Sequence, residues 1–474
     1  MASAAAAPSL TERYTQAQAR NVALFVLSVL AVYVLQPATP IRQMDFWLPT
    51  ASLLLAVIAW AATMPLTHGP LARASAADML IVAGIVLAIA ATRYVDPLGA
   101  LITRTPAPDV LLVLPMLVVG MVVAFLIARL IGPRPAWTWG ILVVLLVLLV
   151  ALKLEPLTQL LAGALRAWQG QLMAAASAAD VRWLGFSYLF FRLAAALRER
   201  AAGKLPAMSL REFITYALFA PAWIAGPIDR PERFLRDLRA DFRFNLADAT
   251  EGGRRIALGA FKKFVLADLL ALFALSEANA AQVRSAGWAW LLVYAYALRI
   301  YFDFGGYSDI AIGIARVCGI RLPENFDRPY LKPNLTQFWN SWHISLAQWF
   351  RAYYFNPLTR AMRTRGWRVP AIILTGQLST MLLIGLWHGV TWNFAFWGLW
   401  HGLGLFIHNR WADFAKTHIA LCTARPTFHR ALNLLGAVLT FHFVALGWVW
   451  FALPDPGLAW QMFGTLFGLW TSAP

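Results

Sequence analysis

Apolar residues along the chain form long continuous runs that do not alternate with polar ones. The first, Val22 to Leu35, follows Arg13 and Arg20 and is predicted to be an uncleaved membrane anchor. Several runs are too short to cross about 30 Å of hydrocarbon at 1.5 Å per residue, so we expect some helices to be tilted, re-entrant or interfacial. The later runs are roughly 46–64, 78–92, 110–131, 137–152, 184–197, 210–226, 256–276, 286–302, 305–320, 369–388, 391–408, 431–453 and 457–470. The pattern predicts an all-α polytopic membrane protein with roughly 11 transmembrane helices plus interfacial or re-entrant helices.

Composition supports the membrane class. Hydrophobic residues make up 60% of the chain and charged residues 13%, with a mean hydropathy of +0.61, whereas a soluble domain carries about 25% charged residues. The net charge is +17, but the basic residues lie between apolar runs, as is typical of cytoplasmic loops. Residues 228–263 combine nine basic with six acidic residues and are predicted to form a solvated cytoplasmic loop. We therefore expect contact with membrane lipid and no nucleic-acid partner.

The apolar runs change in character near residue 180. Before it they are plain Leu, Val and Ala segments, and after it aromatic and polar residues enter them. The sequence predicts N-terminal transmembrane helices of unassigned role over residues 1–180, and a core that carries the chemistry over residues 181–474. The stretch 153–182, with scattered polar residues among alanines, is expected to be an interfacial connector.

Residues 335–353, after the potential N-cap Asn334, separate at 100° per residue into an aromatic face and a polar face. This pattern predicts one amphipathic helix that lies at an interface or along a cavity. His343 falls on the border of the two faces, which suits a proton-handling or substrate-orienting group. The alternative is an interfacial histidine bonded to a lipid headgroup or a backbone carbonyl.

The segment from Val369 to Asn409 contains no charged residue. As a single helix it would be about 60 Å long, twice the bilayer core, so we predict a break at Gly389 and place His388 in the last turn before it. The sequence GLWHG occurs twice, at 385–389 and 398–402, and one of its two histidines is expected to face a site. The alternative is that both form structural hydrogen bonds between helices. Polar residues at this depth are functional candidates by default: Gln377, Ser379, Thr380, His388, Asn393 and His401.

Other chemistries lack support in the sequence. The chain has no P-loop, no GxGxxG after a strand and no GxSxG, and its two cysteines have no metal-ligand spacing. No HExxH motif accompanies the histidines, so no metal site is expected. Asp303 and Asp309 lie in an apolar stretch, where they would be ion-coupling groups of a transporter or structural partners of Arg299 and Arg316. The structural interpretation is preferred.

Six segments carry recognisable motifs in order: LFAPAWIAGPIDRPERFLRDL (218–238), IALGAFKKFVLADLLA (256–271), YFDFGGYSDIAIGIARVCGIRLPENFDRPYL (301–331), FWNSWHISLAQWFRAYYFNPL (338–358), GLWHGVTWNFAFWGLWHG (385–402) and GWVWFALPD (447–455). They resemble successive motifs of the membrane-bound O-acyltransferase family, in its bacterial alginate O-acetyltransferase branch. The resemblance covers roughly residues 184–455. It implies a polytopic enzyme of the bacterial inner membrane, with a central tunnel in which a cytoplasmic acyl donor reaches an acceptor hydroxyl on the other side.

The resemblance also assigns residues. The family's essential histidine, in the first WHG motif, maps onto His388, and a second family position, in the WHIS motif, maps onto His343. His388 is expected to take the proton of the attacking hydroxyl, and His343 to orient or polarise the thioester carbonyl. Substrate-binding positions are expected at Trp339, Trp387, Trp392 and Asn393, and at Lys262 and Lys263. With Arg254 and Arg255, the two lysines would hold donor phosphates or serve as topology anchors.

The donor implied is acetyl-CoA or an acyl carrier thioester, with no tightly bound cofactor. Exopolysaccharide O-acetylation is the preferred activity, through a separate extracytoplasmic acyltransferase partner that delivers the group to the polysaccharide. The alternatives are D-alanyl transfer to teichoic acid and a non-enzymatic ion-coupled transporter. Relatives carry a Gly-Gly-Asn-Arg sequence where this chain has TRAMRTRG (359–366), and residues 1–180 do not resemble the branch's usual N-terminal segments.

Overall fold

The computed structural model describes residues 10–63, 70–95, 102–127, 129, 135–418 and 426–469. The secondary structure of these residues is helical, and its one β feature is an isolated antiparallel bridge between Phe326 and Trp342. The predicted all-α class is confirmed. The chain divides into two compact units: unit 1 is Met1–Gly253 with Ala311–Leu322, and unit 2 is Arg254–Ile310 with Pro323–Pro474. The predicted division at residue 180 lies inside unit 1.

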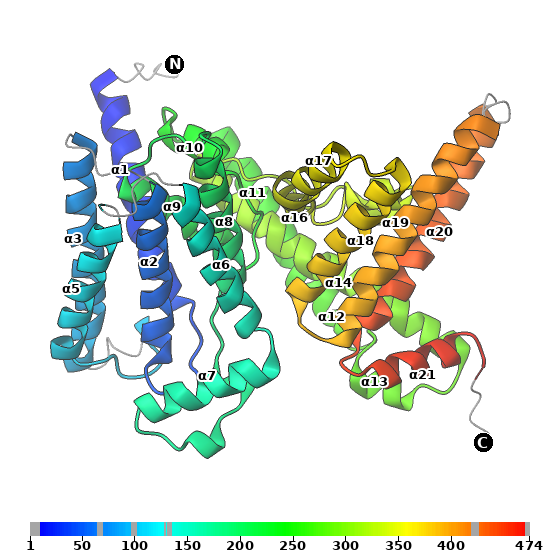
Figure 1. Cartoon of the computed structure of the whole chain (residues 1–474), viewed down its shortest axis with the longest axis horizontal. Helices are drawn as coiled ribbons and strands as arrows, with labels where there is room; N and C mark the ends of the chain where they lie inside the picture. The colour runs from blue at the N-terminus through cyan, green and yellow to red at the C-terminus, as the bar shows by residue number, and fades with distance from the viewer. Residues whose placement is uncertain are drawn as a thin grey trace, which may run out of the picture. The chain divides into compact units, whose positions relative to one another are not determined.

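Unit 1 is built from the N-terminal helices (Figure 1). They are α1 (Leu10–Val34), α2 (Met44–Thr63), α3 (Pro70–Ala91), η1 (Thr92–Tyr94), α5 (Val110–Leu126), α6 (Pro135–Ala151), α7 (Glu155–Trp168), η3 (Met173–Ala175), η4 (Ala178–Asp180), α8 (Phe186–Ala201), α9 (Leu210–Ala217), η5 (Ala220–Ala222), α10 (Pro231–Arg239) and the first part of α11 (Leu246–Phe261).

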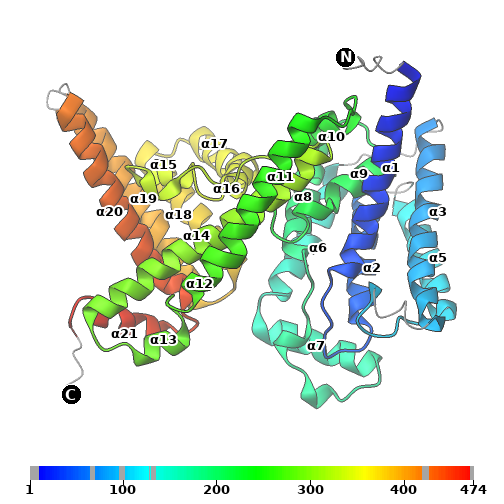
Figure 2. The same cartoon turned by 180° about the vertical axis from the view of Figure 1, so that it is seen from behind.

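Unit 2 begins inside α11, and the last part of α14 returns to unit 1. Its helices are the π-helix η6 (Lys262–Ala267), α12 (Asp268–Ala271), α13 (Glu277–Gln282), α14 (Ala286–Val317), η7 (Pro329–Leu331), α15 (Leu335–Trp339), α16 (Ile344–Phe350), the π-helix η8 (Arg351–Phe355), α17 (Asn356–Thr364), α18 (Val369–His388), α19 (Trp392–His418), α20 (Pro426–Ala452) and α21 (Pro456–Leu466). In both views α18, α19 and α20 run side by side (Figures 1 and 2).

Among the described residues, 5 helices are long and apolar enough to cross a membrane, or up to 6 if a bent pair counts as one span. The bent pair is α6 and α7, which turn by 95° at a short break. The protein is therefore a multi-pass membrane protein, and the predicted N-terminal anchor, Val22 to Leu35, overlaps the first of these spans. The candidates are Gln16–Val34, Met44–Thr63, Ala74–Tyr94, Val369–His388 and Arg430–Ala452.

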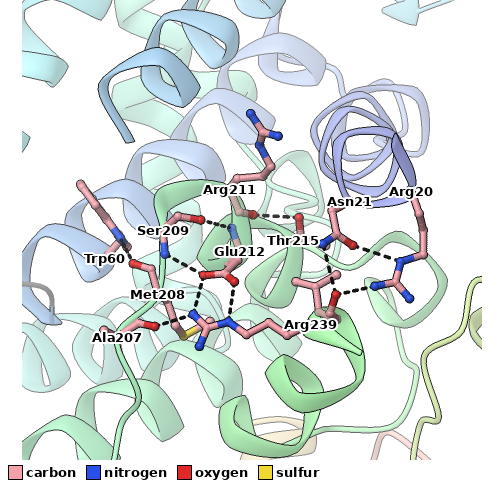
Figure 3. Close-up of polar contacts among 11 residues, drawn as sticks. Arg20, Asn21, Trp60, Ala207, Met208, Ser209, Arg211, Glu212, Thr215 and Arg239 are labelled. Carbon is pink, nitrogen blue, oxygen red and sulfur yellow. Dashed lines mark hydrogen bonds and ion pairs between the residues drawn. The ribbon is translucent and has the colours of Figure 1, made fainter. Parts of the chain in front are cut away.

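Polar contacts join the helices of unit 1 at the end that holds α10 (Figure 3). Ser209 caps α9: its hydroxyl accepts from the Glu212 amide at 3.2 Å, and the Glu212 carboxylate accepts from the Ser209 amide at 2.8 Å. The same carboxylate pairs with Arg239 of α10 at 2.7 Å. The Trp60 indole of α2 donates to the Met208 carbonyl at 3.1 Å. A Ser-x-x-Glu capping box thus also ties α9 to α10.

Candidate active site

The chain breaks between α18 and α19 at the predicted position. α18 ends at His388, and Gly389 follows in extended backbone, with φ −175°. A Cβ atom at Gly389 would lie 2.7 Å from the ring of Phe394. Glycine is therefore needed here for the close approach of the Phe394 ring and not for a left-handed turn. The predicted place of His388 in the last helical turn is confirmed.

The glycines of both GLWHG copies lie where α18 and α19 touch. A Cβ atom at Gly398 would lie 2.6 Å from the Met381 carbonyl oxygen, and one at Gly402 would lie 2.9 Å from Leu378 Cα. A Cβ atom at Gly385 would overlap the backbone of α19 in the same way. Because small residues four apart let two helices pack at backbone contact, the repeated motif accounts for the tight hairpin that holds His388.

His388 is half-buried in an aromatic surround. Its ring centroid lies 4.7 Å from that of Phe451, 5.6 Å from that of Trp397 and 4.5 Å from that of Trp387. The three rings come from α20, α19 and α18 respectively. The imidazole is therefore positioned by packing from three helices, which restricts the direction in which it can present a nitrogen.

The expected single amphipathic helix over 335–353 is wrong. The structure has α15, a break at residues 340–343, α16 and then the π-helix η8. His343 takes a left-handed conformation, φ 43° and ψ 53°, which an L-residue rarely adopts. The reason is tertiary: the Asp327 amide donates to the Ser341 carbonyl at 3.0 Å, and the Ile344 amide donates to the Asn325 carbonyl at 3.0 Å. These bonds replace those that would have continued the helix.

Asn325 is a positioning residue that the sequence analysis missed. Its side chain is completely buried; its amide nitrogen donates to Ser308 at 3.2 Å, and its amide oxygen accepts from the Ser345 hydroxyl at 2.6 Å. It therefore ties α14 to the first turn of α16, directly beside His343. Its only sequence signal is a polar residue inside the conspicuous PENFDRPYL segment.

His343 is 3% exposed and lies outside the candidate spans. Its ring packs against Phe304, with centroids 4.6 Å apart. Burial lowers the pKa of His343 to about 3, so the imidazole is neutral at physiological pH. Nε2 of this ring has no hydrogen-bond partner within the described part of the chain. A neutral, buried imidazole with an unused nitrogen is suited to bind a polar atom of a ligand.

The two predicted catalytic histidines meet at one tryptophan. Trp387 lies 4.5 Å from His388 and 6.2 Å from His343, measured between ring centroids. His343 lies just before α16 and His388 is the last residue of α18, with η8 and α17 between these helices. The structure thus brings His343, Trp387 and His388 together.

The remaining predicted binding residues lie in different places. Trp339 is buried and its ring centroid lies 5.2 Å from that of His401 and 5.8 Å from that of Trp397. Asn393 is buried and donates to the Leu453 carbonyl at 2.5 Å. Trp392 is 71% exposed, and ring packing is recorded only with Phe396 among the described residues. Of these, Trp339 is connected to His388 through Trp397.

His401, the histidine of the second GLWHG copy, is fully buried. Neither of its ring nitrogens has a hydrogen-bond partner among the residues that the structure describes. It packs on Trp397 at 4.9 Å and on Trp339 at 5.2 Å between ring centroids. His401 therefore does not make the helix-bridging hydrogen bond that the structural alternative required.

Lys262 and Lys263 pair with carboxylates of α14. The Lys262 ammonium lies 2.7 Å from Asp309, and the Lys263 ammonium lies 2.5 Å from Asp303. Asp309 also accepts from Arg255 at 2.9 Å. These ion pairs favour the structural interpretation of both acids over ion coupling.

The expectation that Asp303 and Asp309 pair with Arg299 and Arg316 is wrong. Arg316 pairs with Asp248 at 2.9 Å, while the lysines of η6 take Asp303 and Asp309. The physical reason is the close approach of α11 to α14, where a Cβ atom at Gly259 would lie 2.6 Å from the Gly306 carbonyl oxygen. Contacts between distant segments therefore supply the partners, and spacing within one helix does not.

A cavity of about 210 Å³ is lined by residues of α18 from Gln377 to Ile384, about one to three helical turns before His388. Its polar lining includes Gln377 and Thr380, both singled out from the sequence, and Asn340 and Arg351, which were not. Two buried polar atoms at this cavity, the Trp339 indole nitrogen and the Gln377 amide oxygen, have no partner in the described residues. One is a donor and the other an acceptor.

The chain matches the model of the membrane-bound O-acyltransferase family over residues 134–451. It is 36% identical over 299 residues to the probable alginate O-acetylase AlgI of Azotobacter vinelandii, covering 61% of this chain and 54% of that protein. It is 34% identical over 289 residues to the peptidoglycan O-acetyltransferase of Helicobacter pylori, covering 58% and 52%.

A third relative, the teichoic acid D-alanyltransferase of Streptococcus thermophilus, is 34% identical over 247 residues, or 50% of this chain and 59% of that protein. The chain thus spans about half the length of the curated relatives it matches. The family model covers well over half of this chain and includes the first five of the six motifs, over residues 218–402. This confirms the resemblance drawn from the motifs, and the chain belongs to the membrane-bound O-acyltransferase family.

Proposed function

We propose that the protein is a membrane O-acyltransferase that moves an acetyl group from a cytoplasmic thioester to a hydroxyl group of an exopolysaccharide. The observation that carries this proposal is the meeting of His343 and His388 at Trp387, in a chain of this family. Relatives named alginate O-acetylase and peptidoglycan O-acetyltransferase support acetyl as the group and a carbohydrate polymer as the acceptor.

In the proposed reaction His388 accepts the proton of the attacking hydroxyl. The hydroxyl oxygen forms a bond to the acetyl carbon, the carbon–sulfur bond of the thioester breaks, and the thiol leaves with the proton that His388 held. His343, neutral because it is buried, would donate from Nε2 to the carbonyl oxygen as negative charge develops there. His343 thus polarises the donor and His388 activates the acceptor.

The donor is acetyl-CoA or an acyl carrier thioester, and no cofactor is held tightly. Both donors carry a flexible arm with amide groups before the thioester. The cavity lined by the part of α18 that precedes His388 contains Trp339, with a donor, and Gln377, with an acceptor, and neither has a partner within the described residues. This supports a route for that arm along α18. Lys262 and Lys263 are already paired with Asp309 and Asp303, which supports the anchoring role for these lysines over phosphate binding.

The proposed topology has roughly 11 spans and interfacial helices around a central tunnel, in the bacterial inner membrane. The expected loop over 228–263 is wrong in form, since the residues fold into α10, α11 and the start of η6. The basic residues around α10 would face the cytoplasm, where the donor is available. Delivery to the polysaccharide would then need a separate extracytoplasmic acyltransferase partner.

The test uses the purified full chain, radiolabelled acetyl-CoA and a hydroxyl acceptor such as an unacetylated polysaccharide, with and without the partner protein. We expect labelled acceptor from the wild type and none above background from His388→Ala. Labelled product from both proteins alike would overturn the assignment. Transfer from a D-alanyl carrier thioester but not from acetyl-CoA would favour the second candidate, which the similarity to a teichoic acid D-alanyltransferase supports. Ion flux in liposomes without acyl transfer would favour the transporter.

A further inference from the structure

A second cavity, of about 280 Å³, lies in unit 1 between α2, α3 and α5. Its walls are almost entirely apolar: Leu54 and Val57 come from α2, Val82 from α3, and Met116 and Gly120 from α5. Because an unfilled apolar void forfeits the dispersion contacts of its lining atoms, a void of this size in a membrane protein favours an apolar occupant.

The cavity reaches the surface through side chains that face the bilayer. Leu54 is 38% exposed and Met116 is 45% exposed, although both also line the cavity. α2 and α3 contain candidate spans, and α5 is a shorter apolar helix. The outer face of α5 carries exposed aliphatic residues at Leu111, Leu112, Leu114, Val118, Val119, Val122 and Val123. What borders the opening is therefore lipid hydrocarbon and not water.

One end of the cavity is lined by two tryptophans, and one of them carries a hydrogen-bond donor that is unpartnered within the described residues. Trp47, in the first turn of α2, packs against Trp168 of α7 with ring centroids 5.5 Å apart, and both line the cavity. The Trp47 side chain is 8% exposed, and its indole nitrogen is a buried donor without an acceptor in the described residues. Trp168 is half-exposed at the end of the amphipathic helix α7. Tryptophans in such positions are typical of the level of lipid headgroups.

A basic residue, Arg42, lies just before the first turn of α2 at this end. The amide of Arg42 donates at 3.0 Å to Gln171, in the turn that follows Trp168, and the Arg42 side chain is exposed. No ion pair of Arg42 occurs within the part of the chain that the structure describes. The nearby Asp45 carboxylate is occupied by the amide of Thr105 at 2.6 Å and by its hydroxyl. An anionic headgroup would thus meet a donor and a positive charge.

We propose that this cavity binds one acyl chain of an anionic glycerophospholipid. The chain fills the space between α2, α3 and α5, an ester carbonyl accepts from the Trp47 indole, and the phosphate lies near Arg42. The lipid belongs to the leaflet at the end of unit 1 where α7 lies, opposite the end that holds α10 (Figures 1 and 2). This binding needs no acyl transfer and is independent of the proposed function.

The test is native mass spectrometry of the full chain, delipidated in detergent and then supplied with phosphatidylglycerol. The wild type should retain one lipid. Gly120→Leu places a side chain in the cavity, where even a Cβ atom lies 3.3 Å from Leu54, and should weaken retention by about tenfold. Trp47→Phe keeps an aromatic ring but removes the donor, and should weaken retention by about three- to tenfold.

The matched control is Gly84→Leu on α3. A Cβ atom at Gly84 meets nothing within 4 Å, and Gly84 does not line the cavity, so this variant should bind lipid as the wild type does. Equal retention by the wild type and Gly120→Leu would overturn the site, and retention unchanged in Trp47→Phe would overturn the headgroup placement. Selective retention of a polyprenyl phosphate instead of phosphatidylglycerol would overturn the lipid class. If thermal melting shows Gly120→Leu unfolded, Ala83→Leu fills the cavity from α3 in its place.

Discussion

His388 and His343 hold different kinds of position, and the difference supports different roles. His388 ends a helix and is half-buried among rings from three helices, whereas His343 lies in a strained turn and is almost completely buried. Residues kept in rare backbone conformations cluster at functional sites because the surrounding structure holds them there. In the proposed mechanism the proton acceptor, His388, is thus the more accessible imidazole, and the carbonyl-polarising group, His343, is the more enclosed one.

His388→Ala is expected to lower acyl transfer by about 10²–10⁴, the usual worth of general acid–base catalysis. The protein should remain in the membrane at normal abundance, because His388 is half-buried and ends its helix. Radiolabel transfer and immunoblotting of membranes measure the two quantities. The matched control is His401→Ala, which should reduce abundance more than turnover because His401 is fully packed. The reverse pattern would mean that the second GLWHG copy carries the reactive histidine.

His343→Gln is expected to change the response of stability to acid. The pKa of His343 is about 3 in the folded protein and about 6.5 when unfolded. Between these values the unfolded state binds the extra proton, so the wild type loses stability as pH falls through that window, by at most about 1.4 kcal/mol per pH unit. The variant lacks this contribution. Thermal unfolding in detergent at pH 7 and pH 5 should show a smaller loss for His343→Gln; an identical loss would contradict the buried neutral imidazole.

At the scale of elements, the helix break at Gly389 could be predicted from the sequence, because it follows from the length of the apolar segment. The break at residues 340–343 could not, because it follows from contacts with residues distant in the sequence. A charge-free segment twice the bilayer thickness must turn, and Gly389 marks the place. By contrast, the amphipathic pattern continues without interruption through residues 340–343, and only the backbone bonds to Asn325 and Asp327 open the helix there. Those bonds join segments whose contact no local pattern encodes.

The hairpin offers a prediction at this scale. Gly398→Ala should destabilise the protein by about 1–3 kcal/mol, the usual cost of overpacking, because its Cβ atom would lie 2.6 Å from the Met381 carbonyl oxygen. Gly253→Ala, in α11, is the control, since a Cβ atom there meets nothing within 4 Å. It should be neutral or stabilising by up to about 1 kcal/mol. Melting temperatures in detergent compare the two; equal effects would contradict the backbone contact of α18 with α19.

At the scale of the whole molecule, the distribution of charge determines orientation. Basic residues concentrate in and around α10, at Arg230, Arg233, Arg236, Arg239 and Arg243, and the contacts of Figure 3 place Arg20, Arg211 and Arg239 at that same end of unit 1. Lysine and arginine near the ends of spans resist translocation. This end of unit 1 is therefore expected to face the cytoplasm, and the amphipathic helix α7 the opposite side.

Cysteine labelling measures that orientation. In a background without Cys318 and Cys422, Ala240→Cys should react with a membrane-impermeant maleimide only after the cells are opened, because residue 240 follows α10. Ala174→Cys, in the exposed turn after α7, should react on intact spheroplasts. Labelling in the opposite order would invert the topology and place the donor entrance on the wrong side of the membrane.

The glycine contacts between α18 and α19 also have a mechanical consequence. Two helices whose backbones touch at Gly385, Gly398 and Gly402 leave no room for one to slide or tilt against the other. The hairpin of α18 and α19 is thus rigid, and it holds His388 in a fixed position at its end. Any movement that admits a substrate or releases a product is therefore expected in segments outside the contact of α18 with α19.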